Sequence, residues 1–199
     1  MLSFPVTSSL PSCAAPLATA LALLGYGVPA GAGDNPADPR LPASREAVGA
    51  FAAELKGALT AGLASGGPIG AIGVCRDQAP AIAADGSRAL GAQVGRTSER
   101  LRNPANAPTR AERAVLDAFA RRVAAGEAAE TMEHWEILAD GSALYMKPIM
   151  VGGPCLACHG RDLAPPIAAA IDAAYPGDQA TGYEEGDLRG AFRIVWPPE

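Results

Sequence analysis

The sequence predicts an α+β domain, in which helices flank a small group of strands. Three observations support this fold class. Apolar residues recur at helical spacing between residues 44 and 84, Thr109 and Glu112 form a capping box ahead of a third amphipathic segment, and Asp140-Gly141 separates two segments that alternate in polarity. With 199 residues, the chain is long enough for one such domain with a proper core after removal of an export segment.

The N-terminus predicts export. An apolar run extends from Cys13 to Leu24, and small residues after it offer cleavage at Ala30 or Ala32, although no Lys or Arg precedes the run. Cys13 stands before the apolar run rather than after it, which argues against a lipoprotein anchor. We therefore expect a signal peptide at 1–32, a disordered arm at 33–43 and a folded domain at 44–199. No other segment is expected to cross a bilayer, so the mature protein is expected to be soluble and periplasmic.

The charge pattern and the motif content argue against several classes of partner and reaction. The formal net charge is −5 and the pI is about 5.1, without any block of Lys or Arg, so neither nucleic acid nor an anionic membrane surface is expected as a partner. The sequence has no glycine-rich phosphate loop, and its two histidines do not support a Ser/His/Asp arrangement. The mild acidity mainly indicates solubility.

Two helices are predicted at the start of the domain. The first covers 44–66, with Ser44 as its N-cap and Gly66-Gly67 as its stop. The second begins with a proline, covers 68–84 and carries Cys75 on its inward apolar face.

The remaining elements alternate between strands, loops and helices. They are a short strand at 92–95, a loop at 95–108, a helix at 109–126, hairpin strands at 132–139 and 143–151, a helix at 165–174 and a strand at 190–196. The density of Arg, Asn and Pro in the loop excludes a regular helix or a central strand there. Pro148 predicts a sheet edge or a bulge near the end of its strand.

The chemically most informative segment is Cys155-Leu156-Ala157-Cys158-His159. Two thiols three positions apart, followed at once by an imidazole, form the pattern of covalent haem c attachment. In this interpretation Cys155 and Cys158 bind the two vinyl groups of one haem, and His159 is the proximal iron ligand. The alternatives are a redox dithiol, a disulfide, or half of a zinc site completed by His134 and Cys75.

The distal side of such a haem leaves two interpretations of Cys75. A lone cysteine on an apolar helix face is usually a small core residue, but elimination of other candidates favours it as the distal ligand. His134 points away from the clearest apolar residues of its predicted strand, and Met146 and Met150 are candidates for an apolar haem wall. Haem propionates need cationic partners, for which Arg96 and Arg102, together with Arg100, are candidates.

An ordered set of motifs resembles a known family, the Tll-type single-haem c domains, a PAS-like haem-binding group long catalogued as a domain of unknown function. The resemblance covers residues 45–196 and rests on five matches: Val74-Cys75-Arg76, Gly95-Arg96-Thr97-Ser98 continuing into Leu101-Arg102-Asn103-Pro104-Ala105-Asn106-Ala107-Pro108, Lys147-Pro148-Ile149, Cys155-Leu156-Ala157-Cys158-His159-Gly160, and Tyr175-Pro176-Gly177-Asp178 with the segments 180–183 and 186–190.

The resemblance implies a PAS-like antiparallel sheet with helices that enclose one covalent haem c. It also implies His/Cys axial ligation, carried here by His159 and Cys75. Because both axial positions would then be filled, electron transfer or redox sensing is expected rather than catalysis. The expected partners are a redox protein or a sensor-kinase system, with the oligomeric state, including a homodimer, left open. The alternative is a gas-binding haem sensor in which the cysteine ligand is displaced.

Overall fold

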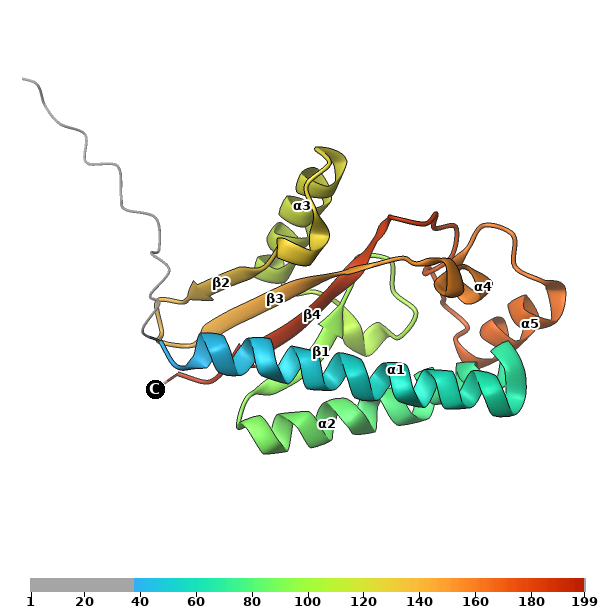
Figure 1. The fold of residues 1–199 in the computed structure, drawn as a ribbon, viewed down its shortest axis with the longest axis horizontal. Coiled ribbons are helices and arrows are strands. Elements are labelled where there is room, and N and C mark those ends of the chain that lie inside the picture. Colours follow the sequence, from blue (N-terminus) through green and yellow to red (C-terminus); the bar gives the residue numbers. More distant parts are fainter. Residues whose placement is uncertain (1–37, 199) are drawn as a thin grey trace, which may run out of the picture. The chain divides into compact units, whose positions relative to one another are not determined.

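The structure is a computed structural model that describes residues 38–198. These residues form an α+β fold whose sheet is antiparallel, in the order β1-β4-β3-β2 (Figure 1). The strands are β1 (Gln93–Thr97), β2 (His134–Ile137), β3 (Ala143–Met150) and β4 (Leu188–Trp196). The predicted fold class is therefore confirmed.

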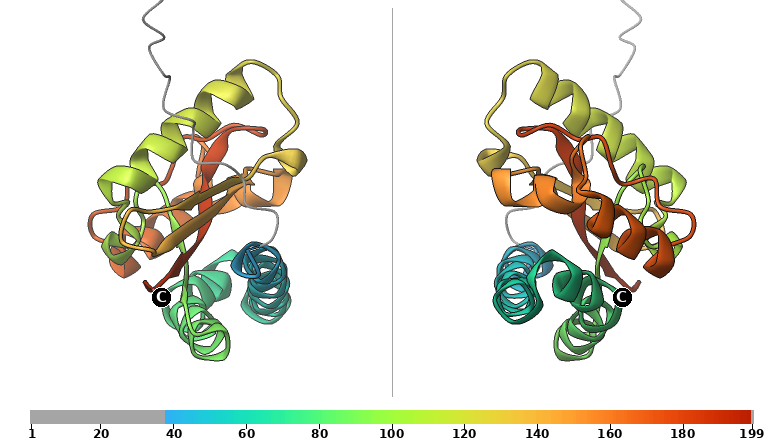
Figure 2. Two further views of the ribbon diagram at one scale, coloured as in Figure 1. Left: turned by 90° about the vertical axis from the view of Figure 1, so that its left-hand side faces the viewer. Right: turned by 90° about the vertical axis from the view of Figure 1, so that its right-hand side faces the viewer.

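Helices cover both faces of this sheet. They are α1 (Arg40–Gly73), α2 (Ala79–Leu90), α3 (Arg110–Ala124), α4 (Leu156–His159) and α5 (Pro165–Ala174), with a π-helical segment η1 (Val74–Gln78) between α1 and α2 and short 3-10 segments η2 (Pro104–Asn106), η3 (Ala129–Thr131) and η4 (Gly153–Cys155). In Figure 2, α3 lies on one side of the sheet and the α1–α2 pair on the other.

The chain reverses direction within α1. Gly67 has φ of 61°, a left-handed conformation that glycine adopts at low cost, and it separates two helical segments. After the reversal Gly62 lies so close to Val74 that a Cβ atom on Gly62 would stand 2.6 Å from the Val74 side chain. The predicted stop at Gly66-Gly67 is thus confirmed, and the two arms run back beside each other (Figure 1).

The first helix begins earlier than predicted. The Arg40 backbone N–H donates to Asp38 Oδ1 at 2.9 Å, and the helix starts at Arg40 instead of after Ser44. Ser44 is buried, donates to the Arg40 carbonyl and accepts a hydrogen bond from Trp196 Nε1 at 2.8 Å. Residues 40–43, expected in a disordered arm, are therefore helical, whereas the predicted signal peptide and residues 33–37 lie outside the described residues.

One helical stretch of the described residues has the length and composition of a membrane span. It covers residues 40–90 and contains an 18-residue window with a mean hydropathy of 1.4, of which 22% is buried. We expected no such stretch after residue 32. The stretch arises because the helices between residues 40 and 90 are rich in Ala and Leu, which gives this part of the chain a high mean hydropathy. The stretch turns back at Gly67, and length and composition alone do not distinguish a membrane span from a helix of a folded domain.

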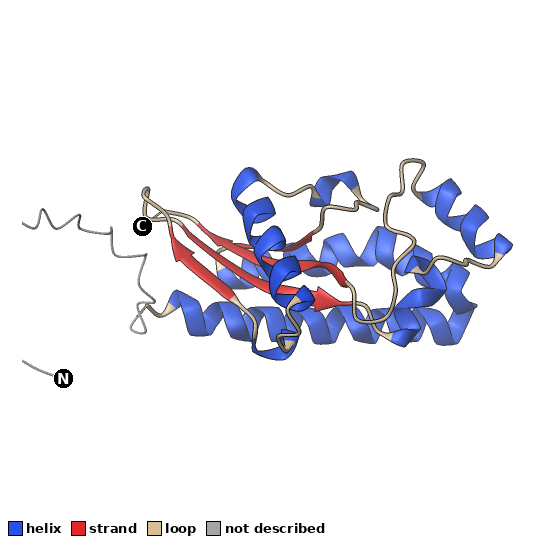
Figure 3. Ribbon diagram, turned by 90° about the horizontal axis from the view of Figure 1, so that it is seen from above, coloured by secondary structure: helices blue, strands red, loops and turns tan. Residues whose placement is uncertain are grey.

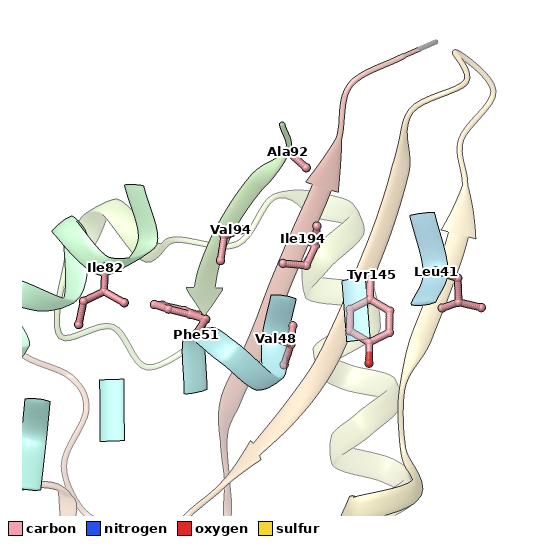
Figure 4. Close-up of a cluster of buried hydrophobic side chains, with 8 residues drawn as sticks. All are labelled: Leu41, Val48, Phe51, Ile82, Ala92, Val94, Tyr145 and Ile194. Carbon is pink, nitrogen blue, oxygen red and sulfur yellow. The ribbon is translucent and has the colours of Figure 1, made fainter. Parts of the chain in front are cut away.

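Two apolar clusters hold the helices to the sheet. On the α1–α2 side the cluster contains Leu41, Val48, Phe51, Ile82, Ala92, Val94, Tyr145 and Ile194 (Figure 4). On the other side the α3 cluster contains Val115, Leu116, Phe119, Met132, Leu144, Met146 and Ala191. Successive residues of β3 therefore serve opposite layers, as the two-residue period of a strand requires.

Local signals in the sequence account for several boundaries. The capping box is present: the Glu112 N–H donates to Thr109 Oγ1, and the Thr109 N–H donates to the Glu112 carboxylate. Gly141 has φ of 83° in the turn between β2 and β3. Pro148 lies beyond the last residue of β3 that pairs with β2, next to a register shift at Ile149/Met150, which agrees with the predicted edge or bulge.

Candidate functional site

The predicted attachment motif forms one tight turn at the end of β3. Segment η4 ends at Cys155, and α4, labelled in Figure 1, carries Cys158 and His159. Figure 3 shows the same fold from above, with helices and strands in separate colours. Cys155 is exposed and Cys158 is half-buried, and both are free thiols. A Cβ atom on Gly160 would stand 2.6 Å from the Leu156 carbonyl oxygen, so the residue after the histidine has to be glycine. The turn presents two thiols and an imidazole within five residues.

His159 is fixed by a main-chain contact. Its Nδ1 lies 2.6 Å from the carbonyl oxygen of Ala180, and with Nδ1–H as the donor, Nε2 keeps its lone pair. Burial, reinforced by the guanidinium groups of Arg189 and Arg102, lowers the pKa of His159 to about 3, while the contact with Ala180 opposes this shift. His159 is therefore a neutral imidazole near pH 7, the form that binds metals.

Cys75 lies in the π-helical segment η1, where the helix departs from its regular spacing. Such π segments are frequent at functional sites. The apolar helix face predicted around Cys75 does not form one continuous contact surface. Ile72 packs against Ile171 and Tyr175, whereas Ile82 belongs to the apolar cluster between α1–α2 and the sheet. Cys75 itself is half-buried. Regular helical periodicity predicted an inward face but could not reveal this irregularity.

Electrostatic neighbours link Cys75 to the attachment turn. Burial raises the pKa of the Cys158 thiol, and negative charge at Cys75 raises it further. Burial raises the pKa of Tyr175 and lowers that of Arg96; negative charge at Cys75 adds to the first shift and opposes the second. The fold thus brings Cys75 near the motif despite the 80 or so intervening residues, which the sequence order alone does not reveal.

The two arginines predicted to meet propionates have different surroundings. Arg96 lies on β1 rather than in the predicted loop, and within residues 38–198 it forms no ion pair. Its pKa is lowered because it is buried. Arg102, in contrast, forms an ion pair with Asp178 and donates to the Cys158 carbonyl at 2.6 Å. Arg96 is therefore the candidate whose charge is not already matched.

Further arginines surround Tyr183, which packs edge-on to His159 at 6.3 Å between ring centroids. The Arg100 guanidinium lies 4.1 Å from the centroid of the Tyr183 ring and that of Arg189 lies 5.4 Å from it. Burial is the main cause that lowers the pKa of Arg189. No pattern in the sequence singles out Arg189, although it stands in the matched segment 186–190.

The alternative ligands lie elsewhere. His134 is on the edge strand β2, where its Nε2 is 3.3 Å from Glu136 Oε2. Met146 is fully buried in the α3 cluster, where its neighbours are apolar side chains. Among the described residues no group of three or more His, Cys, Asp or Glu side chains could hold a metal ion, which leaves the zinc alternative without its donor set.

Comparisons with known proteins identify the family of the chain. No curated protein matches the chain. Among solved structures, the crystal structure of the cyanobacterial heme-protein Tll0287 matches with a TM-score of 0.64 and 26% sequence identity, and the match covers 81% of this chain and 97% of that chain. The Tll0287-like family profile matches residues 40–197. The chain therefore belongs to the Tll0287-like family.

Proposed function

We propose that this chain is an exported c-type cytochrome with one covalent haem, which acts in electron transfer or redox sensing. Cys155 and Cys158 would hold the haem through thioether bonds, and His159 and Cys75 would be its axial ligands. The matched solved structure is a heme protein, which supports haem binding by this chain. Periplasmic location, a PAS-like classification and a redox or sensor-kinase partner remain parts of this proposal, together with the absence of nucleic-acid and membrane binding.

One observation carries the proposal: His159 is held in the state that an axial ligand needs. The Ala180 carbonyl accepts its Nδ1–H at 2.6 Å, and metal-bound histidines almost always donate their other ring N–H in this way. The ring nitrogen that remains is free to bind iron. The thiols of Cys155 and Cys158 precede it on the same turn, as attachment requires.

The proposed ligand pair has chemical consequences. A bound haem supplies a reversible one-electron couple. The thiolate of Cys75 would favour the ferric state, because a negatively charged donor stabilises the higher oxidation state more than a neutral one. With both axial positions filled, no coordination site remains for a substrate, so we propose a carrier or sensor and not an enzyme.

Arg96 is the better propionate partner of the two candidates. It is half-buried and lacks an ion pair within the described part of the chain, whereas the charge of Arg102 is matched by Asp178. A carboxylate next to Arg96 would relieve the cost of a partly buried, unpaired cation. Arg102 could bind a second propionate only through an N–H group that does not already donate to Asp178 or to the Cys158 carbonyl.

Extraction with acidified acetone tests haem attachment directly. We expect the haem to stay with the polypeptide and to stain in a denaturing gel. A Cys155→Ala/Cys158→Ala variant should release all of it, because no thioether bond can form. Cys75→Ser is the matched cysteine control and should retain the haem. Release of haem from the unsubstituted protein would show that the attachment is wrong.

A second candidate function is a gas sensor in which Cys75 leaves the iron. The π-helical geometry at Cys75 favours this candidate, because the helix departs from regular α-helical hydrogen bonding at the residue that would have to leave the iron. Reduced protein that binds carbon monoxide within the mixing time supports the sensor. Reduced protein whose spectrum does not change under carbon monoxide supports the carrier.

A further inference from the structure

Arg102 and Asp178 form a buried ion pair beside the attachment turn. Arg102 Nε lies 3.1 Å from Asp178 Oδ1 and Nη2 lies 2.9 Å from Oδ2, so the contact is bidentate. The two side chains are only 10% and 5% exposed. Two parallel N–H···O bonds fix the plane of a guanidinium group, so this pair is a well-oriented unit and not a fluctuating surface contact.

The pair touches both structures that hold His159. Arg102 Nη2 donates to the carbonyl of Cys158 at 2.6 Å, directly before the histidine. Asp178 Oδ1 accepts from the backbone N–H of Ala180 at 2.9 Å. The carbonyl of Ala180 in turn accepts from His159 Nδ1 at 2.6 Å. The ion pair therefore connects the attachment turn with the carbonyl group that orients the imidazole.

Main-chain contacts continue this connection beyond Ala180. The N–H of Gly182 donates to the Gly160 carbonyl at 2.8 Å, and the N–H of Tyr183 donates to the His159 carbonyl at 2.9 Å. These contacts align the segment after Ala180 with the segment after His159, but none of them is made to the Ala180 carbonyl itself. Arg102 Nη2 lies 3.4 Å from that carbonyl oxygen, and Asp178 holds the N–H of the same residue, so the ion pair contacts Ala180 at both of its main-chain polar groups.

We infer that Arg102 and Asp178 are positioning residues for the iron ligand His159. This inference rests on the proposed function and gives Arg102 a role other than binding a propionate. The hydrogen bond from Nδ1–H to a fixed carbonyl makes the imidazole a stronger donor, which stabilises ferric iron. When the ion pair is disturbed, the Ala180 carbonyl is less well placed, the imidazole donates less, and the reduction potential rises.

Three variants of the haem-loaded protein test this role: Arg102→Lys, Asp178→Asn and the double variant Arg102→Gln/Asp178→Asn. Each is expected to raise the ferrous-to-ferric ratio at a given ambient potential at least tenfold, which corresponds to about 59 mV for one electron. The matched control is Arg161→Gln, which breaks the Arg161–Glu184 pair at 2.9 Å close to the motif, where both side chains are more than 60% exposed (67% and 64%). It should change the ratio less than twofold.

The choice of variants separates positioning from charge. Arg102→Lys keeps the positive charge but loses the fork, and the double variant keeps the net charge, so a purely electrostatic effect predicts no change in either. Positioning predicts that both raise the potential and change the g values of the ferric electron paramagnetic resonance spectrum. Should Asp178→Asn fail to fold, Arg102→Lys decides the question.

Two results that contradict the account can be told apart. Haem-loaded Arg102→Lys and double variants with a ratio within twofold of the unsubstituted protein, and with unchanged g values, overturn the positioning role alone. Unsubstituted protein without covalent haem contradicts the proposed function instead.

Discussion

The α3 cluster and the surroundings of His159 differ in the kind of side chains that they bury. The seven residues of the α3 cluster are apolar and at most 6% exposed. Around His159 the structure places half-buried thiols, two arginines whose pKa values are lowered by burial, and an ion pair. Apolar burial stabilises a fold, whereas buried cations cost stability unless they are paired or bind a ligand. Stability and the proposed chemistry should therefore be separable by substitution.

The largest effect on stability is expected on the α3 side. Phe119 is 1% exposed, and Phe119→Ala should lower the free energy of unfolding by about 3–5 kcal/mol through loss of buried area and creation of a cavity. Denaturant unfolding of the haem-loaded protein measures this change. The comparison predicts that the absorption spectrum of the folded variant stays that of the unsubstituted protein.

Leu63→Ala is the control for this substitution. Leu63 is 37% exposed on α1, so its removal should change the free energy of unfolding by less than about 0.5 kcal/mol. A loss of stability in Phe119→Ala no greater than in Leu63→Ala would contradict the division between the two regions. So would a changed haem spectrum in folded Phe119→Ala.

A smaller, pH-dependent effect on the free energy of unfolding is expected for Glu133, which lies where α1 meets the sheet. Glu133 accepts a hydrogen bond from Tyr145 Oη at 3.0 Å and is paired with Arg45, and mainly this pairing holds the pKa of Glu133 below 4.5. Because the unfolded chain binds this proton more readily, the stabilisation is complete above pH 4.5 and is lost as the pH falls through the folded-state pKa. Glu133→Gln should cost about 1 kcal/mol at pH 7.

Unfolding free energies at several pH values check this expectation. The difference between Glu133→Gln and the unsubstituted protein should shrink as the pH falls below 4.5. Glu127→Gln, which breaks a pair with Arg122 at the surface, should have a smaller effect at every pH. A difference for Glu133→Gln that does not depend on pH would contradict the assigned cause.

Much of the fold could be predicted from local signals. The Thr109/Glu112 capping box, the reversal at Gly67 and the helix at 165–174 each depend on interactions within a few residues, and each is found in the structure. The ends of elements that depend on contacts with distant residues could not be predicted in this way. The helix starts at Arg40 because Asp38 bonds its first N–H group, and Ser44 is instead bonded to Trp196 at the far end of the chain.

The candidate site could be predicted only in part. The attachment turn is local, and so the sequence identifies all three of its side chains. Asp178 and Ala180 act through contacts with residues about 20 or more positions away, and no spacing rule reveals them. The π-helical geometry at Cys75 is likewise invisible to a 3.6-residue period, which placed the thiol on an ordinary apolar face.

The central claim is that His159 and Cys75 close the haem from both sides. Electron paramagnetic resonance of the ferric protein, before and after Cys75→Ser, tests it most directly. We expect a low-spin signal of thiolate type in the unsubstituted protein, and its replacement by a different signal in Cys75→Ser, while the haem stays covalently bound. An identical signal in both proteins would contradict ligation by Cys75.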